Sequence, residues 1–264
     1  MGLFDKFKKK EKSEETKENS VLLSMPMFTS DEVFSLDNII SDLKTYWSLD
    51  VTDKTGNNEV STFIINGETV AVGLMPAPIP ESELKPICEY SYLWKNVSEE
   101  VGKHTNHAIV SVLGNNTSIL ERYKILTMLN ASILRTTSDS IGIYQGNQTL
   151  LLPKSLYLDF ADFLKGDGLP IPLWVYLGLI NNETESSIYT YGLKEFNKTE
   201  IEIIKSSMKG NDLYDFLLSI ITYIIESDVT LKGGETIGFS EEQKIKITES
   251  KGVFLDGKTL KLEI

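Results

Sequence analysis

The spacing of apolar residues in the first half of the chain alternates between helical and strand periods. Between residues 35 and 47 the apolar positions follow one stripe of a helix, with Ser35 available as its N-cap. These positions are Leu36, Ile39, Ile40, Leu43 and Trp47. Residues 61–75 instead form two β-rich runs around Asn66-Gly67, a dipeptide that supplies the positive φ angles of a tight hairpin turn. The sequence therefore predicts a helix followed by a β-hairpin.

The segments on either side extend this pattern. An apolar run at 20–28 has the length of a strand, residues 81–94 restart as a helix interrupted at Pro86, and residues 107–114 are typical of a strand. The prolines of "MPAPIP" (75–80) end the second hairpin strand, because proline cannot donate to a β-ladder. The resulting order is β-α-β-β-α-β, which is the ferredoxin-like pattern.

The second half repeats this order after a helical connection. Strands are predicted at 140–146, 173–180, 187–193 and 200–206, helices at 154–165 and 211–227, and further antiparallel strands within 230–264. We therefore predict an α+β protein with two ferredoxin-like (βαββαβ-type) lobes and mainly antiparallel sheets. The expected parts are a disordered charged leader, an N-terminal lobe, a helical connection and a C-terminal lobe, at 1–20, 21–116, 117–139 and 140–264. An internal duplication would explain the similar hairpins "FIINGET" and "GLINNETES", and so would turn chemistry alone, which selects Asn and Gly.

The net charge and the hydropathy of the chain limit the classes of partner that it is expected to bind. The 264 residues carry a formal net charge of −12, and such an acidic surface repels phosphate backbones, which disfavours nucleic-acid binding. The same charge fits a soluble protein, or one that meets a basic protein partner through electrostatic steering. The longest apolar stretch, within 214–225, contains Asp215 and is too short to span a membrane. We expect a cytoplasmic protein, and the sequence sets no oligomeric state.

Residues 1–20 differ sharply in composition from the rest. Leu3, Phe4 and Phe7 lie among lysines, and a mixed-charge polar run follows. Two interpretations stay open, a solvated and disordered leader or a weak contact with a membrane surface or a partner. The motif for N-terminal myristoylation requires Ser or Thr where this chain has Lys6, so lipidation is not expected.

Several segments resemble a bacterial family known as domain of unknown function 4261. The similarity runs over "LMPAPIP" (74–80), the H-x-x-H run into a V-S-V strand at 104–112, and the later "LWVYLGL", "TYGLKEFNKTEIEI" and "TLKGGETIGFSEEQKIKI". It covers roughly residues 21–264, and Asn106 departs from the small residue that the family favours before its second histidine. The resemblance implies a fold and supplies no activity.

The only two histidines, His104 and His107, are the first candidates for chemistry. A mononuclear zinc site needs three or four converging ligands, and Cys88 is the only cysteine, so carboxylates would have to complete the set. The sequence contains neither of the glycine-rich motifs that bind nucleotides, G-x-x-x-x-G-K-[ST] and G-x-G-x-x-G. We therefore predict no metal, no cofactor and structural roles for the histidines, at a helix end and a strand start. Cys88 lies in an apolar helix, where a buried, unreactive thiol is the usual outcome.

Two carboxylates and two aromatic residues form a second group of candidates. Glu200 and Glu202 alternate with isoleucines, so a strand would place both on one face, either as an acid–base pair or in water. Trp174 and Tyr191 belong to two neighbouring aromatic-rich strands. Whether these aromatic residues line a groove or fill the core depends on strand register.

We favour a non-enzymatic cytoplasmic binding protein that recognises another macromolecule, such as an immunity-like factor for a basic effector. The alternative is an enzyme or small-ligand sensor that uses His104, His107 and Glu200 or Glu202 at a site between the lobes. The first hypothesis is favoured because the sequence assigns no residue a catalytic role. Ferredoxin-like sheets often serve as interaction platforms, which is an analogy at the level of fold alone.

Overall fold

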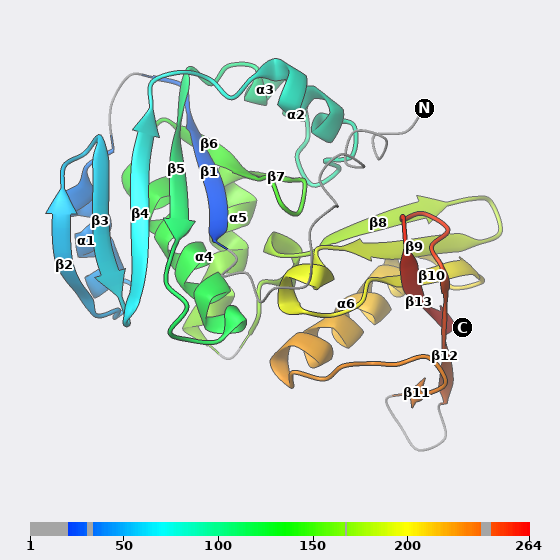
Figure 1. Cartoon of the computed structure of the whole chain (residues 1–264). Helices are drawn as coiled ribbons and strands as arrows, with labels where there is room; N and C mark the ends of the chain where they lie inside the picture. The colour runs from blue at the N-terminus through cyan, green and yellow to red at the C-terminus, as the bar shows by residue number, and fades with distance from the viewer. Residues whose placement is uncertain (1–20, 31–33, 167, 239–243) are drawn as a thin grey trace. The chain divides into compact units, whose positions relative to one another are not determined.

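The computed structural model describes residues 21–30, 34–166, 168–238 and 244–264 (Figure 1). It divides the chain into two compact units, Met1–Leu173 and Trp174–Ile264. Each unit combines helices with one sheet whose strands pair mainly antiparallel, which confirms the predicted α+β class. The charged leader predicted at 1–20 lies outside the described residues.

The first unit is built on a seven-stranded sheet with the order β2-β3-β4-β5-β1-β6-β7. Its strands are β1 (Leu22–Phe28), β2 (Val51–Gly56), β3 (Val60–Ile65), β4 (Glu68–Met75), β5 (Asn106–Val112), β6 (Ser140–Gln145) and β7 (Leu150–Pro153). All neighbouring strands pair antiparallel. In a ferredoxin-like sheet the first strand lies between the third and fourth strands of the βαββαβ unit. Here β5 lies between β4 and β1, so the ferredoxin-like arrangement is not confirmed for this unit.

The local signals in the sequence appear where they were predicted. Asn66 and Gly67 both have positive φ, at 47° and 85°, and they join β3 to β4 as a tight hairpin. Ser35 caps α1 by accepting a hydrogen bond from the Asn38 N–H. The helices of this unit are α1 (Leu36–Thr45), α2 (Glu81–Cys88), α3 (Val97–Val101), α4 (Ile119–Thr136) and α5 (Lys154–Ala161), with 3-10 turns at Asp162–Lys165 and Ile171–Leu173.

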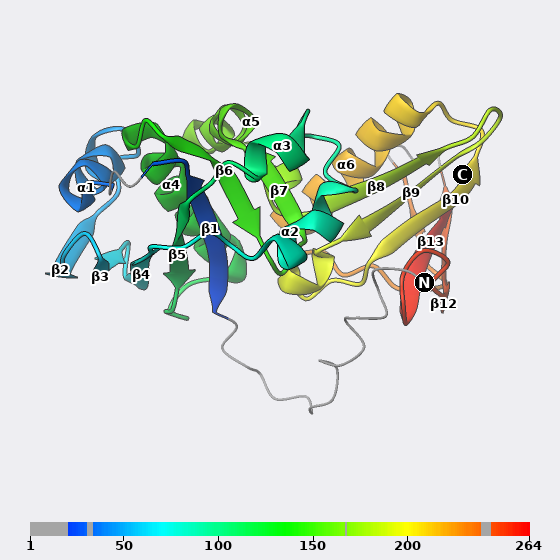
Figure 2. The same ribbon diagram turned by 90° about the horizontal axis from the view of Figure 1, so that it is seen from above.

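Helices cover both faces of this sheet. In Figure 1, α1, α4 and α5 lie behind it, and the Ser24 hydroxyl of β1 donates to the Asn130 side chain of α4. Met27, which lies an odd number of residues along β1 from Ser24, faces the other way and joins the core under α2 and α3. That core contains Ile79, Leu84, Ile87, Trp94, Val97, Val101, Tyr144 and Leu151. Figure 2 shows α2 and α5 on opposite sides of the sheet.

The boundary between the units differs from the predicted one. Residues 140–173 were assigned to the C-terminal lobe, but β6 pairs with β1 and extends the first sheet. α4 is therefore a core helix of the first unit, and it packs on β1, β5 and β6 rather than bridging two lobes. The sequence could not indicate this, because a strand carries no local signal of which strand it will pair with.

The second unit has a six-stranded sheet with the order β11-β12-β13-β10-β9-β8. Its elements are β8 (Tyr176–Asn181), β9 (Ser186–Tyr191), a 3-10 turn (Leu193–Phe196), β10 (Ile201–Ser206), α6 (Gly210–Glu226), β11 (Thr236–Ile237), β12 (Ile245–Lys251) and β13 (Lys258–Glu263). α6 packs on β8 and β9, and β10 with β13 is the one parallel pair among the described strands. No helix in the described ranges, α6 included, is long and apolar enough to cross a bilayer.

The two sheets do not support a duplication. They differ in strand number and order, and a parallel pair occurs only in the second among the described strands. The similar hairpins also differ, because β3 and β4 are joined by a two-residue turn, whereas Asn181 pairs with Ser186 across a four-residue loop. Turn chemistry alone accounts for the shared Asn residues.

Candidate functional site

Both histidines hold the backbone of the proline-rich loop that follows β4. The Ile79 N–H donates to Nε2 of His104 over 2.8 Å, and Nδ1 of His107 donates to the Ala77 carbonyl over 2.8 Å. The opposite nitrogen of His104, Nδ1, donates to the carbonyl of Val101 at the end of α3. The H-x-x-H run and the "MPAPIP" loop are therefore one structural unit, formed by residues about 30 positions apart.

His104 is buried and neutral in this arrangement. Burial lowers its pKa, the hydrogen bond to the Val101 carbonyl opposes that effect, and nearby His107 adds to the lowering. Because Nε2 accepts a hydrogen bond and Nδ1 donates one, neither nitrogen has a free lone pair for a metal or a transferred proton. The geometry gives His104 a structural role.

A cleft of about 490 Å³ adjoins this loop between α2 and α3. Apolar side chains of Ile79, Leu84 and Val101 line it, together with the polar groups of Glu81, Lys85, Cys88 and Ser98. Burial raises the pKa of the Cys88 thiol, and a hydrogen bond with the Ser98 side chain opposes the rise only in part. Cys88 is therefore a thiol rather than a nucleophilic thiolate at neutral pH.

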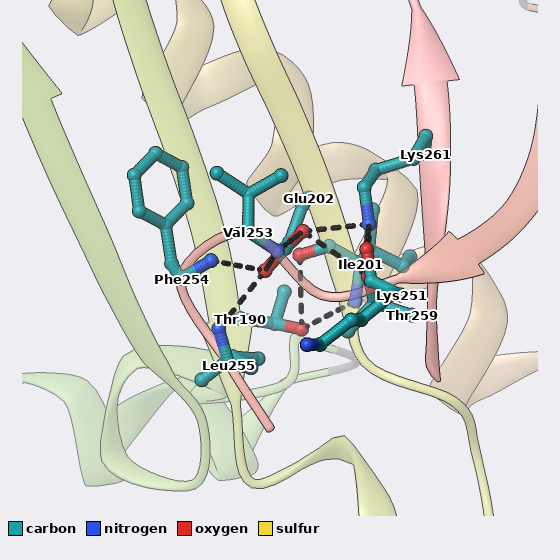
Figure 3. A network of polar contacts seen from close by, with 9 residues as sticks. All are labelled: Thr190, Ile201, Glu202, Lys251, Val253, Phe254, Leu255, Thr259 and Lys261. Carbon is teal, nitrogen blue, oxygen red and sulfur yellow. Dashed lines mark hydrogen bonds and ion pairs between the residues drawn. The ribbon is translucent and has the colours of Figure 1, made fainter. Parts of the chain in front are cut away.

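Glu202 is a fully buried carboxylate at the centre of a polar network (Figure 3). It accepts hydrogen bonds from three consecutive backbone N–H groups, those of Val253, Phe254 and Leu255, at 2.9–3.2 Å. The Thr259 hydroxyl donates over 3.1 Å, and the Lys261 ammonium lies 2.7 Å away. The carboxylate thus holds the turn between β12 and β13.

The electrostatics of this network favour the charged form of Glu202. Burial by itself raises the pKa of Glu202, but the Lys261 ammonium and the N–H groups of Val253 and Phe254 outweigh burial, so the pKa lies below its ordinary value. The turn is also compact, since a Cβ atom on Gly252 would lie 2.1 Å from the Leu255 carbonyl oxygen. Glu202 is a permanently ionised anchor at neutral pH.

Glu200 holds a different segment. It lies one residue before β10 and accepts hydrogen bonds from the Thr190 hydroxyl at 2.6 Å and from the Gly192 N–H at 2.9 Å. Its carboxylate is buried, as is that of Glu202. The two glutamates were predicted to share one face as an acid–base pair or in water, but they have separate sets of donors and neither is exposed.

Strand register decides whether each aromatic candidate lies in the core or on an exposed part of the sheet. Trp174 precedes β8, is fully buried and packs on Phe196 with ring centroids 5.9 Å apart, so it belongs to the core. Tyr191 lies directly opposite Tyr176 and is partly exposed. Tyr189 stacks on Phe254 of the Glu202 turn with centroids 5.4 Å apart. The prediction placed Trp174 and Tyr191 on neighbouring strands and left open whether they line a groove or fill the core; Trp174 lies in the core, and Tyr191 is partly exposed on the sheet.

Five of the residues that build these sites were not identified from the sequence. Lys261, Thr259 and the turn at 253–255 complete the Glu202 network. For this region the sequence predicted only antiparallel strands within 230–264. Within the described ranges, no group of three or more His, Cys, Asp or Glu side chains could hold a metal ion.

The comparisons with known proteins add one match. Residues 189–263 match the family model described as Domain of unknown function (DUF4261), so the resemblance to this family is confirmed over that segment. The matched segment contains β10, α6 and the Glu202 network, and it does not include His104 or His107. No curated protein and no solved structure matches the chain.

Proposed function

We propose that this chain is a non-enzymatic binding protein of the cytoplasm that recognises another macromolecule. The observation that carries the proposal is the engagement of its candidate acid–base groups. His104 has both ring nitrogens bonded to backbone, and Glu200 and Glu202 each hold backbone N–H groups of a turn. General acid–base catalysis requires a group within hydrogen-bond reach of a substrate proton. The hydrogen-bonding atoms of these three side chains are already bonded to other parts of the protein.

The charge of the chain supports a basic protein as the partner. The formal net charge is −12, and an excess of one sign steers an oppositely charged protein and accelerates its association. An immunity-like role, in which the chain neutralises a basic effector, is the specific form of this proposal. Like charges repel, so the same surface opposes nucleic acid.

Affinity capture at two salt concentrations tests the proposal. The full chain is immobilised and exposed to lysate of its native host, and captured proteins are identified by mass spectrometry. We expect a saturable complex with a basic protein at about 50 mM salt that weakens at about 500 mM, because salt screens exposed charges. The control is an unrelated protein of equal net charge. No capture above that control would remove the main support for the proposal.

The cleft beside His104 favours a second candidate, a small-ligand sensor or an enzyme. Its volume of about 490 Å³ lies in the range of ligand pockets. The earlier hypothesis combined His104, His107 and Glu200 or Glu202. Metal analysis of protein purified without a histidine tag, beside a His104→Ala, His107→Ala double variant, tests it. Stoichiometric metal that disappears in the variant would make this candidate the leading one.

A further inference from the structure

We propose that His104 is a proton-sensitive anchor, and that protonation of its imidazole releases the proline-rich loop of residues 76–80. The inference goes beyond the proposed function and does not depend on it. It rests on the few backbone donors of this loop and on the hydrogen bonds of the two histidines that hold it.

Prolines leave the loop with only two backbone donors. The three prolines among residues 76–80 have no N–H group, so Ala77 and Ile79 carry the only ones. The Ala77 N–H stays within the segment and donates to the Met75 carbonyl over 2.8 Å. The Ile79 N–H is thus the one donor of this loop that binds another element, and its acceptor is Nε2 of His104 at 2.8 Å.

The hydrogen bonds around His104 assign the tautomer of its ring. Nδ1 faces the Val101 carbonyl, which can only accept, so Nδ1 carries the proton. The lone pair of Nε2 is then directed at the Ile79 N–H. A second proton on the ring would take this same lone pair, and a protonated nitrogen cannot accept a hydrogen bond. A proton and the loop therefore compete for Nε2.

His107 holds the same loop in a way that protonation does not disturb. Its Nδ1 donates to the Ala77 carbonyl over 2.8 Å, and a charged imidazole donates from both nitrogens. Protonation of both rings would break the contact at Ile79 and retain the one at Ala77. The response of the loop to protons therefore comes from His104.

The charged and titratable groups around His104 come from three elements. His107 lies on β5, where its strand partners are the uncharged Met27 and Met75. The groups on or bonded to α2 and α3 are Glu81, Glu83 with its partner Tyr144, Lys85, Cys88, Glu99, Glu100 and Lys103. Glu99 and Lys103 pair with each other over 2.9 Å.

The closed loop keeps His104 neutral, and the open loop does not. Burial lowers the pKa of His104, the hydrogen bond to Val101 opposes this effect, and the charge of His107 adds to the lowering. Release of the loop exposes the ring to water, where its ordinary pKa is 6.5. The open state therefore binds protons more tightly than the closed state, and a fall in pH below 6.5 shifts the equilibrium toward the open state.

Opening of the loop changes the cleft between α2 and α3. Pro78 and Ile79 line this cleft together with His104, and the side chain of Ile79 is 2% exposed in the core cluster. The apolar contacts of Ile79 oppose its release, so the closed loop predominates at neutral pH. Acid converts the cleft from a closed to an open form while the rest of the unit stays folded.

Amide hydrogen exchange of the full chain tests the proposal, since it reports local opening at single N–H groups. Exchange is measured by NMR at pH 7.5, 6.5 and 5.5 and corrected for the intrinsic rate at each pH. The open fraction at the Ile79 N–H should rise by up to about tenfold between pH 7.5 and 5.5. The control is the Thr105 N–H beside His104, which donates over 2.9 Å to the Phe28 carbonyl, an acceptor that does not titrate. No rise at Ile79, or an equal rise at Thr105, would overturn the local release.

The ring nitrogens give a second readout that requires no variant. The ¹⁵N spectrum at pH 7.5 should show His104 as the neutral Nδ1–H tautomer, and its titration should lie below that of an exposed histidine. A charged ring at pH 7.5, or a neutral ring with its proton on Nε2, would overturn the competition for Nε2.

His104→Gln and His107→Gln separate the two histidines. Glutamine offers an acceptor that takes up no proton between pH 5.5 and 7.5, so His104→Gln should abolish the pH dependence at the Ile79 N–H. His107→Gln should retain it. A pH dependence that survives in His104→Gln, or that is lost only in His107→Gln, would remove His104 as the proton-sensitive anchor. If His104→Gln does not fold, the exchange and ¹⁵N measurements on the unaltered chain still decide the question.

Discussion

In each unit a buried polar side chain anchors a loop, His104 in the first and Glu202 in the second, and these two side chains differ in charge. In the first unit the neutral imidazole of His104 binds the loop after β4 through one N–H and one carbonyl. In the second unit the carboxylate of Glu202 binds the turn after β12 through three N–H groups, a hydroxyl and the Lys261 ammonium. A neutral anchor needs only its hydrogen-bond partners, whereas a buried charge is costly unless several hydrogen bonds or an opposite charge replace its lost hydration.

The difference shows why only one of the two anchors has a large network. The energy of a buried carboxylate rises steeply unless several donors replace its lost water, and five donor groups surround Glu202. His104 avoids this cost because its pKa is lowered and it stays neutral. We therefore expect substitutions at the two anchors to differ in size and in their dependence on pH.

The largest effect should come from Glu202→Gln. The substitution leaves the Lys261 ammonium without its counter-ion, although the Lys261 side chain is only 13% exposed. It also places the NH₂ group of the new amide among N–H donors that need an acceptor. Breaking a buried ion pair from one side costs about 3–5 kcal/mol, so the free energy of unfolding, measured in urea, should fall by about 3 kcal/mol. The matched control is Glu249→Gln, whose exposed pair with Lys258 should contribute little. Equal effects of the two substitutions would contradict the role of Glu202.

His104→Leu should have a smaller effect. It leaves the N–H of buried Ile79 without a partner, and an unpaired buried donor costs about 1–3 kcal/mol. We expect a loss of about 2 kcal/mol in urea denaturation. His107→Leu is the control, and it should cost less because exposed Ala77 can present its carbonyl to water. If His107→Leu lowered the free energy of unfolding more than His104→Leu does, the hydrogen bond from Ile79 to His104 would not be the stronger anchor of the loop.

Glu200→Gln separates the effect of charge from that of burial. Glu200 is buried like Glu202, but its donors are the Thr190 hydroxyl and the N–H groups of Gly192 and Lys194. No ammonium group is among these donors, so the cost should be that of weakened hydrogen bonds, about 1 kcal/mol. A loss as large as that of Glu202→Gln would mean that the counter-ion is not what distinguishes the two glutamates.

The smallest effect is a dependence of stability on pH. The pKa of His104 is lowered in the fold from an ordinary value of 6.5, so below pH 6.5 the unfolded chain binds more protons than the folded one. The contribution of His104 is therefore complete above pH 6.5 and is lost as the pH falls toward its folded pKa. Glu202, also lowered, loses its contribution only below its ordinary value of 4.5. Urea denaturation at pH 7.5, 6.5 and 5.5 should show a decline that His104→Leu removes and Glu202→Gln retains.

Most helices and strands followed from local patterns. The α1 stripe, the Ser35 cap and the Asn66-Gly67 turn are present as predicted. Three elements were missed. β2 (Val51–Gly56) is almost entirely exposed and has no apolar alternation, β7 (Leu150–Pro153) is only four residues long, and α3 (Val97–Val101) only five. Periodicity needs several turns or repeats to stand out from composition, so such short elements gave no signal.

The sites were harder to predict than the elements. The sequence identified His104, His107, Glu200 and Glu202 as unusual positions, but it could not show that all four are buried and bonded to backbone. Alternation along one strand assigned both glutamates to one face. It missed that the carboxylate of Glu202 would meet a turn more than fifty residues later.

The sequence by itself determined where helices begin, where hairpins turn and that the surface is acidic, because capping, φ preferences and net charge depend on neighbouring residues or on simple sums. Only the tertiary structure decided that β6 joins β1, that two histidines hold a proline loop, and which donors surround Glu202. These contacts join residues far apart in the chain. Their free energy depends on register, burial and the desolvation of polar groups, which no local pattern encodes.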